Sequence, residues 1–305
     1  MPLIIRDFRP EDAETVLAVR RAAVPFLVQT PQAVIDHAAH APAAMRLRLL
    51  VAELDGEIVG AGQVGLQHET TEPGQAFANP QVHPDHRSRG AGTALLAEAE
   101  RYLRGLGATR VHAWVMDEEG PRAFAEHRGY TSSRSSRILR LDLTGTPLPE
   151  VPALPAGTGL RPLGAFREDP DGLFALESEV VQDEPGDVVS DALQFDAWFD
   201  DTFVHGGIDQ ELSTVVVVDG VPAAHSYVET DGRTRLASRG TGTARAYRGR
   251  GLARLAKIDS LGRARAAGYT DAFTGNDDTN APMLAINKRL GYEPFAGERR
   301  YVRDL

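Results

Sequence analysis

Two short segments of the chain repeat the pattern Arg-x-x-Gly-x-small. The first comprises Arg87, Ser88, Arg89, Gly90, Ala91 and Gly92. The second comprises Arg248, Gly249, Arg250, Gly251, Leu252 and Ala253. Each segment follows an extended stretch and opens an amphipathic one, so its backbone N–H groups would lie in the first turn of a helix. Unpaired donors and the helix dipole favour an anion there, and the pattern predicts two phosphate-binding loops.

Glycine and arginine would serve different purposes in such a loop. Gly90, Gly92 and Gly251 remove side chains where the backbone must approach a pyrophosphate, and Ala253 is the smallest alternative. Charge-assisted N–H bonds of roughly 1.5–3 kcal/mol each could hold two phosphates, and the arginines add attraction. The alternative is an ordinary glycine-containing loop before a surface helix. The second occurrence of the pattern favours the phosphate site.

The elements around the two segments also repeat. Residues 82–107 align with residues 243–268 without a gap, and each stretch contains an apolar helical stripe. Strand-turn-strand patterns with a central Asp-Gly, typical of hairpins, precede them at residues 48–60 and 213–224. A second helix and a terminal strand follow in each half. This order indicates a tandem duplication.

A proline-rich stretch separates the two halves. The sequence of 305 residues suits two domains of about 150 residues each. Residues 146–158 contain too much proline for a helix or a central strand, so we expect an extended linker there. The expected domains are therefore residues 1–145 and residues 159–305.

The two motifs resemble those of the GNAT superfamily of acyl-CoA-dependent N-acyltransferases. In that family the loop motif is followed by a helix that ends in Gly-aromatic, as at Gly129-Tyr130 and Gly291-Tyr292. The resemblance covers nearly the whole chain. It implies a mixed α/β fold of two tandem GNAT-like domains, each a splayed, mixed and mostly antiparallel sheet flanked by helices. The gap in such a sheet receives the pantetheine arm of acetyl-CoA, here the co-substrate.

The resemblance implies that both loops bind the cofactor. Val82 and Thr93 flank the first loop, and Thr243 precedes the second. The second half also carries Asn276, Asn280 and Asn287, in a block that resembles many bacterial GNAT enzymes. Asn280 could cap a helix, while the other two could hydrogen-bond the amides of the cofactor. The first half has no matching asparagine, so we expect the second half to be the catalyst and the first to be degenerate.

The proton-transfer groups are harder to place. Where many family members carry a tyrosine that protonates the leaving thiolate, this chain has Ala125 in the first half and Asn287 in the second. As the base we favour Glu229, at the end of a strand that also carries His225, with Asp231 as the fallback. The alternatives are a packed strand histidine and solvated carboxylates beside a turn.

Two other groups of polar residues admit both interpretations. The acidic run at residues 177–187 could recognise a cationic amine or form a solvated helix end. In the first half, His68, Glu69 and Glu72 lie in a region comparable to that of Glu229.

Composition excludes several classes of protein. The net charge of −10 argues against nucleic-acid binding, which needs a basic stripe. The absence of cysteine excludes disulfides and a thiol nucleophile, and no metal-ligand spacing is present. The first residues contain only a brief apolar run, so we expect neither a signal peptide nor a membrane span, and a cytoplasmic location.

These features together predict an acetyl-CoA-dependent N-acetyltransferase that acts on a primary amine of a small molecule. Direct attack on the thioester needs a neutral amine, a proton route and polarisation of the carbonyl. The alternative from another class is a non-catalytic acyl-CoA-binding or sensor protein, which the missing tyrosine would favour.

Overall fold

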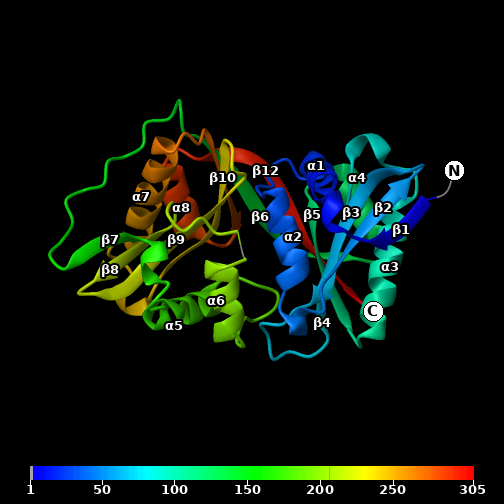
Figure 1. The fold of residues 1–305 in the computed structure, drawn as a ribbon, viewed down its shortest axis with the longest axis horizontal. Helices are drawn as coiled ribbons and strands as arrows, with labels where there is room; N and C mark the ends of the chain where they lie inside the picture. Colours follow the sequence, from blue (N-terminus) through cyan, green and yellow to red (C-terminus); the bar gives the residue numbers. More distant parts are fainter. Residues whose placement is uncertain (1–2, 206) are drawn as a thin grey trace. The chain divides into compact units, whose positions relative to one another are not determined.

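The computed structural model describes residues 3–205 and 207–305. The chain divides into two compact units, and each contains helices packed on a sheet (Figure 1). Unit 1 contains the chain up to Ser136, together with Asp187–Ala192 and Ala296–Leu305. Unit 2 contains Arg137–Gly186 and Leu193–Phe295. Both units are mixed α/β structures with mostly antiparallel strands, which confirms the predicted fold class.

Unit 1 is built on strands that lie in the order β1-β2-β3-β4-β5-β12. They are β1 (Leu3–Asp7), β2 (Arg48–Leu54), β3 (Glu57–Leu66), β4 (Gln75–Val82), β5 (Arg110–Met116) and β12 (Glu293–Asp304). The pairs are antiparallel except for β4 with β5, which are parallel. Its helices are α1 (Ala13–Ala23), α2 (Pro31–His40), α3 (Ala91–Gly105) and α4 (Glu119–Glu126), with short turns η1 (Pro10–Asp12), η2 (Ala43–Met45) and η3 (Pro84–His86).

Alternation along the strands of unit 1 produces two apolar faces. Leu50 and Ala52 point to the face that packs against α3, in one cluster with Leu95. Val51 points to the other face, where it contacts Val16 of α1. The sheet is therefore covered by helices on both sides, as Figure 1 shows for α1 and α3.

Unit 2 repeats this arrangement with strands in the order β7-β8-β9-β10-β11-β6. They are β7 (Thr158–Pro162), β8 (Thr214–Val218), β9 (Val221–Thr230), β10 (Arg235–Thr243), β11 (Asp271–Asp277) and β6 (Thr131–Asp142), whose first residues belong to unit 1. Its helices are α5 (Asp171–Val180), α6 (Phe195–Phe203), α7 (Leu252–Ala266) and α8 (Ala281–Arg289), with η4 (Leu163–Phe166), η5 (Val181–Asp183) and η6 (Arg245–Tyr247).

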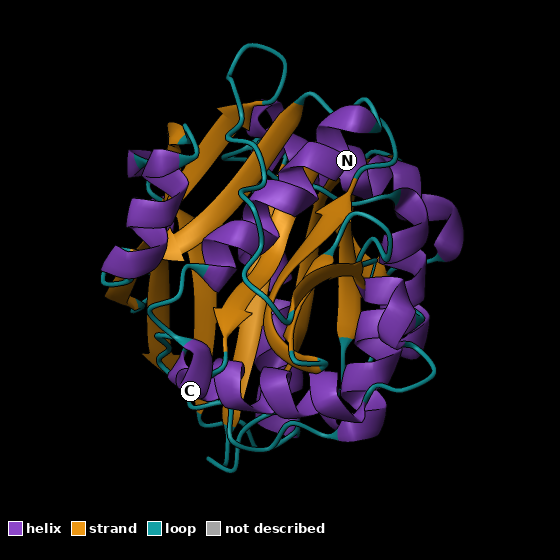
Figure 2. Cartoon of the chain, turned by 90° about the vertical axis from the view of Figure 1, so that its left-hand side faces the viewer, coloured by secondary structure: helices purple, strands orange, loops and turns teal. Residues whose placement is uncertain are grey.

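The core of unit 2 also alternates between faces. Val216 packs with Leu252 and Leu255 of α7, whereas Val215 packs with residues of α5 and α6. Figure 2 shows strands with helices against them in this part of the chain. No helix of the described residues is both long and apolar enough to cross a membrane.

The internal repeat predicted from the sequence is visible in both units. Helices α3 and α7 have the same length of 15 residues. The two Asp-Gly hairpin turns both adopt left-handed backbone, with φ of 59° at Asp55 and 51° at Asp219 and a glycine at positive φ after each. The repeat therefore extends to the turns as well as the helices.

The final strands of the two halves are exchanged relative to the expected domains. β12 pairs antiparallel with β5 in unit 1, while β6 is the neighbour of β11 in unit 2. Residues 137–145 consequently lie in unit 2 and residues 296–305 in unit 1. The expected bounds assumed that each half folds on itself. Because β6 and β12 are repeat copies of 12 residues each, either strand suits either sheet edge.

Candidate functional site

Each unit contains one pair of parallel strands that separates part-way along its length. In unit 1 the pairing of β4 with β5 ends at Phe77↔His112. In unit 2 the pairing of β10 with β11 ends at Ala237↔Phe273. The side chains beyond these pairs decide whether an open cleft forms.

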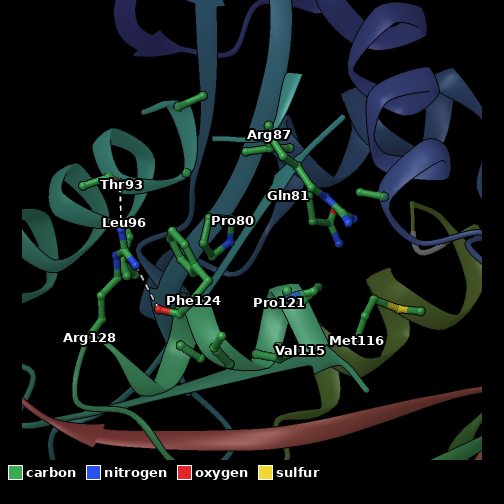
Figure 3. Close-up of a pocket in the computed structure, with 18 of the residues that line it drawn as sticks. Pro80, Gln81, Arg87, Thr93, Leu96, Val115, Met116, Pro121, Phe124 and Arg128 are labelled. Carbon is green, nitrogen blue, oxygen red and sulfur yellow. Dashed lines mark hydrogen bonds between the residues drawn. The ribbon is translucent and has the colours of Figure 1, made fainter. Parts of the chain in front are cut away.

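In unit 1 a cavity of about 550 Å³ opens where β4 and β5 diverge. Its walls come from the separated strand ends, the start of α3 and helix α4, and most of its lining is apolar. Figure 3 shows Pro80 and Phe124 in the middle of this cavity, with Met116 at one side and Thr93 and Arg128 at the other. The volume lies in the range of small-molecule sites.

The first arginine-glycine loop forms one end of this cavity. Gly90 is the N-cap of α3 with φ of 91°, and no side chain caps the helix. The N–H groups of the first turn are therefore available to an anion. Residues predicted to bind the cofactor that line the cavity are Val82, Arg87, Ser88, Gly90, Ala91, Gly92 and Thr93. Arg89 is exposed and lies outside the lining.

Two features keep this end of the cavity open. A Cβ atom at Gly92 would lie 3.3 Å from the ring of Phe124, so glycine is needed for that ring to approach α3. Arg128 donates to Thr93 Oγ1 at 2.5 Å and to the carbonyl of Phe124 at 3.0 Å, which holds α4 against α3 (Figure 3). Arg87 is 40% exposed, and its guanidinium lies 3.8 Å from Glu118. Its side chain is therefore accessible to an anion, with one carboxylate beside it.

The second loop has the same backbone but a different electrostatic setting. Gly251 has φ of 77° and begins α7 as Gly90 begins α3. Arg248, however, forms an ion pair with Asp183, which also accepts from Arg245 at 2.7 Å and 2.9 Å. These two arginines hold the pKa of Asp183 at about 2, Arg245 having the larger effect. Asp183 is thus ionised at neutral pH and reduces the positive charge that these two arginines present to a phosphate.

Glu179 adds a second carboxylate at the same loop. Its Oε1 accepts a hydrogen bond from the backbone N–H of Arg245. Other predicted residues take local contacts: Arg250 stacks on Tyr247, and the carbonyl of Thr243 accepts from Arg248. Gly249 lies in the left-handed region, Leu252 is buried in the α7 core, and Ala253 is half-buried.

The cleft of unit 2 is filled by a lysine. Lys257 of α7 is 1% exposed, and its Nζ donates to Ser238 Oγ at 3.1 Å. Ser238 is the first residue of β10 beyond the paired region. Nζ also lies 5.4 Å from the centre of the Tyr292 ring. Burial lowers the pKa of Lys257 to about 7.

The equivalent positions in unit 1 are open and apolar. Alignment of the repeats places Leu96 opposite Lys257 and Ala78 opposite Ser238, and both residues line the unit 1 cavity. On the other side of β10, a Cβ atom at Gly242 would lie 2.3 Å from Val180 of α5, so that helix is seated directly on the strand.

The three asparagines of the second half contact the protein itself. Asn287 is fully buried and donates to Asn276 Oδ1 at 2.5 Å. Asn280 caps α8 by accepting from the N–H of Met283 at 3.2 Å, as its capping interpretation predicts. The pair of Asn276 and Asn287 therefore ties β11 to α8.

The residues predicted to transfer protons contact other protein groups of unit 2. His225 is 1% exposed and stacks on Tyr227, and its Nε2 lies 3.1 Å from Glu177 Oε2. Burial lowers the pKa of His225 to about 3. Glu229 lies 3.7 Å from Arg239, and Asp231 Oδ1 accepts from three backbone N–H groups of its own turn.

The remaining polar candidates are dispersed. His68 and Glu69 line a small second cavity of about 180 Å³ in unit 1, and Glu72 accepts from Gln75 at 3.4 Å. The acidic run does not act as one surface. Glu179 and Asp183 serve the second loop, whereas Asp187 lies in unit 1, where Ser133 donates to it at 3.0 Å.

Two residues that the sequence interpretation missed define the difference between the units. Lys257 could have been found from the repeat alignment, because it replaces a leucine in an apolar helical stripe. Glu298 of β12 lines the unit 1 cavity. No local signal in the sequence marks it, because its position depends on the pairing of β12 with β5.

The comparisons with known proteins agree with this architecture. The family model described as Acetyltransferase (GNAT) family matches residues 17–130, which contain the first loop. A mycothiol acetyltransferase of Actinosynnema mirum is 26% identical over 96% of both chains. One of Kineococcus radiotolerans is 31% identical over 83% of this chain and 80% of its own. A solved tandem GNAT protein from the clavulanic acid biosynthesis pathway superposes with a TM-score of 0.78 and 25% identity, covering 99% of this chain and 98% of its own.

The fold and these relatives define an acyltransferase with two tandem units. The chain belongs to the GNAT family of acetyltransferases, as the loop motifs indicated. Members of this family use acetyl-CoA. The residues of unit 1 fit that molecule, because an uncapped helix start, a glycine-lined wall and a partly exposed arginine meet at an open cavity.

Proposed function

We propose that the protein transfers the acetyl group of acetyl-CoA to a primary amine of a small molecule, and that this happens in unit 1. The observation that carries the proposal is the 550 Å³ cavity between β4 and β5, with the first loop at one end. The pyrophosphate would bind the N–H groups at the start of α3 and the side chain of Arg87. The acetyl end would reach toward Met116.

The contents of unit 2 support the same assignment. Asp183 and Glu179 occupy the surroundings of the second loop, and Lys257 fills the space that corresponds to the unit 1 cavity. A cofactor would have to displace a buried lysine side chain and two carboxylates at once. We therefore propose a structural role for unit 2, which reverses the expectation that the second half is the catalyst.

The acceptor class follows from the relatives. Two of the relatives reported above are named mycothiol acetyltransferases, so we propose a small amine related to mycothiol as the acceptor. The chemistry requires the amine nitrogen to form a bond with the acetyl carbon while the carbon–sulfur bond breaks and free CoA leaves. No cysteine of the chain can act as an intermediate acceptor, because the sequence contains none. This absence rules out an acyl-cysteine intermediate and supports direct attack by the amine.

The test compares two substitutions at equivalent loop positions in the full chain. In Gly92→Val the new side chain would press on Phe124 and narrow the cavity, so we expect acetyl-CoA affinity to fall by about tenfold or more. Ala253→Val should leave the affinity unchanged. Titration calorimetry with acetyl-CoA measures both, and thermal melting shows that each variant is folded. If acetyl-CoA affinity instead falls in Ala253→Val and is unchanged in Gly92→Val, the cofactor would be assigned to unit 2.

Turnover is tested separately from binding. Release of free CoA is measured with acetyl-CoA and a panel of amino acids, aminosugars and cysteinyl amines. We expect at least one amine of the panel to be acetylated. Acetyl-CoA binding without any turnover would favour a non-catalytic acyl-CoA-binding or sensor protein.

A further inference from the structure

The unit 1 cavity has chemically different ends. One end carries Thr93 and Arg128, and Figure 3 shows Met116 across the cavity from Arg128, with the side chain of Arg87 reaching toward Gln81. Val24 packs in one apolar cluster with Met116, and Trp114 also lines the cavity. A carboxylate at this second end would therefore lie in largely apolar surroundings.

One carboxylate lies at the Met116 end. Glu298 of β12 is the direct cross-strand partner of Met116 in β5 and lines the cavity. Figure 3 shows β12 in faint red below the pocket. Among the described residues that line the cavity, Glu298 is the sole acid. The cavity therefore has one carboxyl group beside Met116, the side toward which we propose that the acetyl group reaches.

We propose that Glu298, supplied to unit 1 by the C-terminal strand, binds the acceptor as an ammonium ion and accepts its proton. The inference rests on the proposed function. It assigns a catalytic residue to a strand that the sequence places at the far end of the chain from the cofactor loop.

Other cavity residues are poorer acceptors of that proton. The hydroxyl of Tyr130 already donates to Glu100 at 3.0 Å inside the core, and burial raises the pKa of Tyr130. His86 lies beside Arg87 at the loop, with its Nε2 3.8 Å from Glu57. Both residues therefore serve other contacts.

The surroundings of Glu298 suit a base at neutral pH. Burial raises the pKa of Glu298 to about 7, and Arg300 on the same strand opposes this shift. The other charged groups near this end are Arg134 of β6, which stacks on Trp114, and Arg87 and His86 at the loop. At pH values above about 7 the carboxylate is ionised and can accept a proton, whereas below that value it cannot.

The step balances with groups that are present. Glu298 takes one proton from the ammonium, which leaves a neutral amine. The nitrogen lone pair then bonds to the acetyl carbon, and the carbon–sulfur bond breaks. The departing thiolate takes the second proton of the nitrogen, and Glu298 returns the first proton to solvent.

The experiment uses the full chain, acetyl-CoA and the panel amine that turns over fastest. Glu298→Gln removes the charge but keeps the size, so we expect kcat/KM to fall by about 10²–10⁴ while acetyl-CoA affinity in calorimetry is unchanged. The wild-type rate should fall below about pH 7, and this acidic limb should be absent from the variant. Glu293→Gln is the matched control, because Glu293 is an exposed acid at the start of the same strand.

The possible results separate the inference from the proposed function. If the wild type acetylates an amine and Glu298→Gln keeps full activity with an unchanged pH profile, the role of Glu298 is overturned and the proposed function stands. Loss of acetyl-CoA binding in Glu298→Gln would also overturn it, because the residue would then hold the cofactor site together. Acetyl-CoA binding by the wild type without acetylation of any panel amine would overturn both proposals.

Discussion

Replacing Lys257 with leucine should stabilise the protein and change how its stability depends on pH. The folded protein lowers the pKa of Lys257 to about 7, compared with about 10.4 for an unfolded lysine. Between these values the unfolded chain holds a proton that the folded chain lacks, so wild-type stability rises with pH. The linked cost of the lysine is about 4 kcal/mol at pH 7 and about 2 kcal/mol at pH 9.

The substitution also removes the donor to Ser238, which costs about 1–2 kcal/mol for a half-buried hydroxyl that loses this partner. At pH 7 the linked cost of burying the lysine, which the substitution removes, is larger than this loss. We therefore expect Lys257→Leu to be about 2 kcal/mol more stable than wild type at pH 7. At pH 9 this advantage should be smaller by about 2 kcal/mol.

Urea unfolding of both proteins at pH 7, 8 and 9 measures the difference. The second lysine of the chain, Lys288, is exposed on α8, so Lys288→Leu is the control and should show no such trend. The reasoning would be refuted if the free energies of unfolding of wild type and Lys257→Leu differed by the same amount at all three pH values. It would mean that Lys257 is hydrated in the folded protein.

Two further outcomes follow from contacts in unit 1. Arg87→Gln removes a partly exposed guanidinium beside the first loop, and acetyl-CoA affinity in calorimetry should fall by about tenfold, with a weaker salt dependence than wild type. An unchanged affinity would show that the backbone N–H groups suffice. Tyr130→Phe leaves Glu100 without one buried donor, although Arg303 still donates at 2.7 Å, so thermal unfolding should show a loss of about 1–2 kcal/mol. Stability equal to wild type would mean that Arg303 alone satisfies Glu100.

Local features of the sequence were sufficient to predict the fold of each repeat. The glycines that begin α3 and α7, the Asp-Gly turns and the apolar helical stripes all act over a few residues. Their structural requirements are short-range, so the pattern alone identifies them. The cap of α8 by Asn280 belongs to the same class.

The difference between the two units could not be predicted in the same way. The second loop has the same glycine and arginine residues as the first, but its charge balance is set by Asp183, which approaches from η5, outside the motif. The asparagine block suggested a cofactor contact, yet Asn287 donates to Asn276 within the protein. A motif defines backbone geometry, whereas ligand access depends on side chains that arrive from other elements.

The exchange of the terminal strands links these observations. A duplicated chain carries two copies of the final strand, and only one residue of that strand needs to differ for the two sheets to differ in chemistry. At the position where β12 brings Glu298 to the unit 1 cavity, alignment of the repeats places Ser136 in β6. Unit 1 therefore receives a carboxylate that its own half of the sequence does not encode at that point. Residues 1–145 expressed alone would lack both this strand and its acid, so the proposed site requires the complete chain.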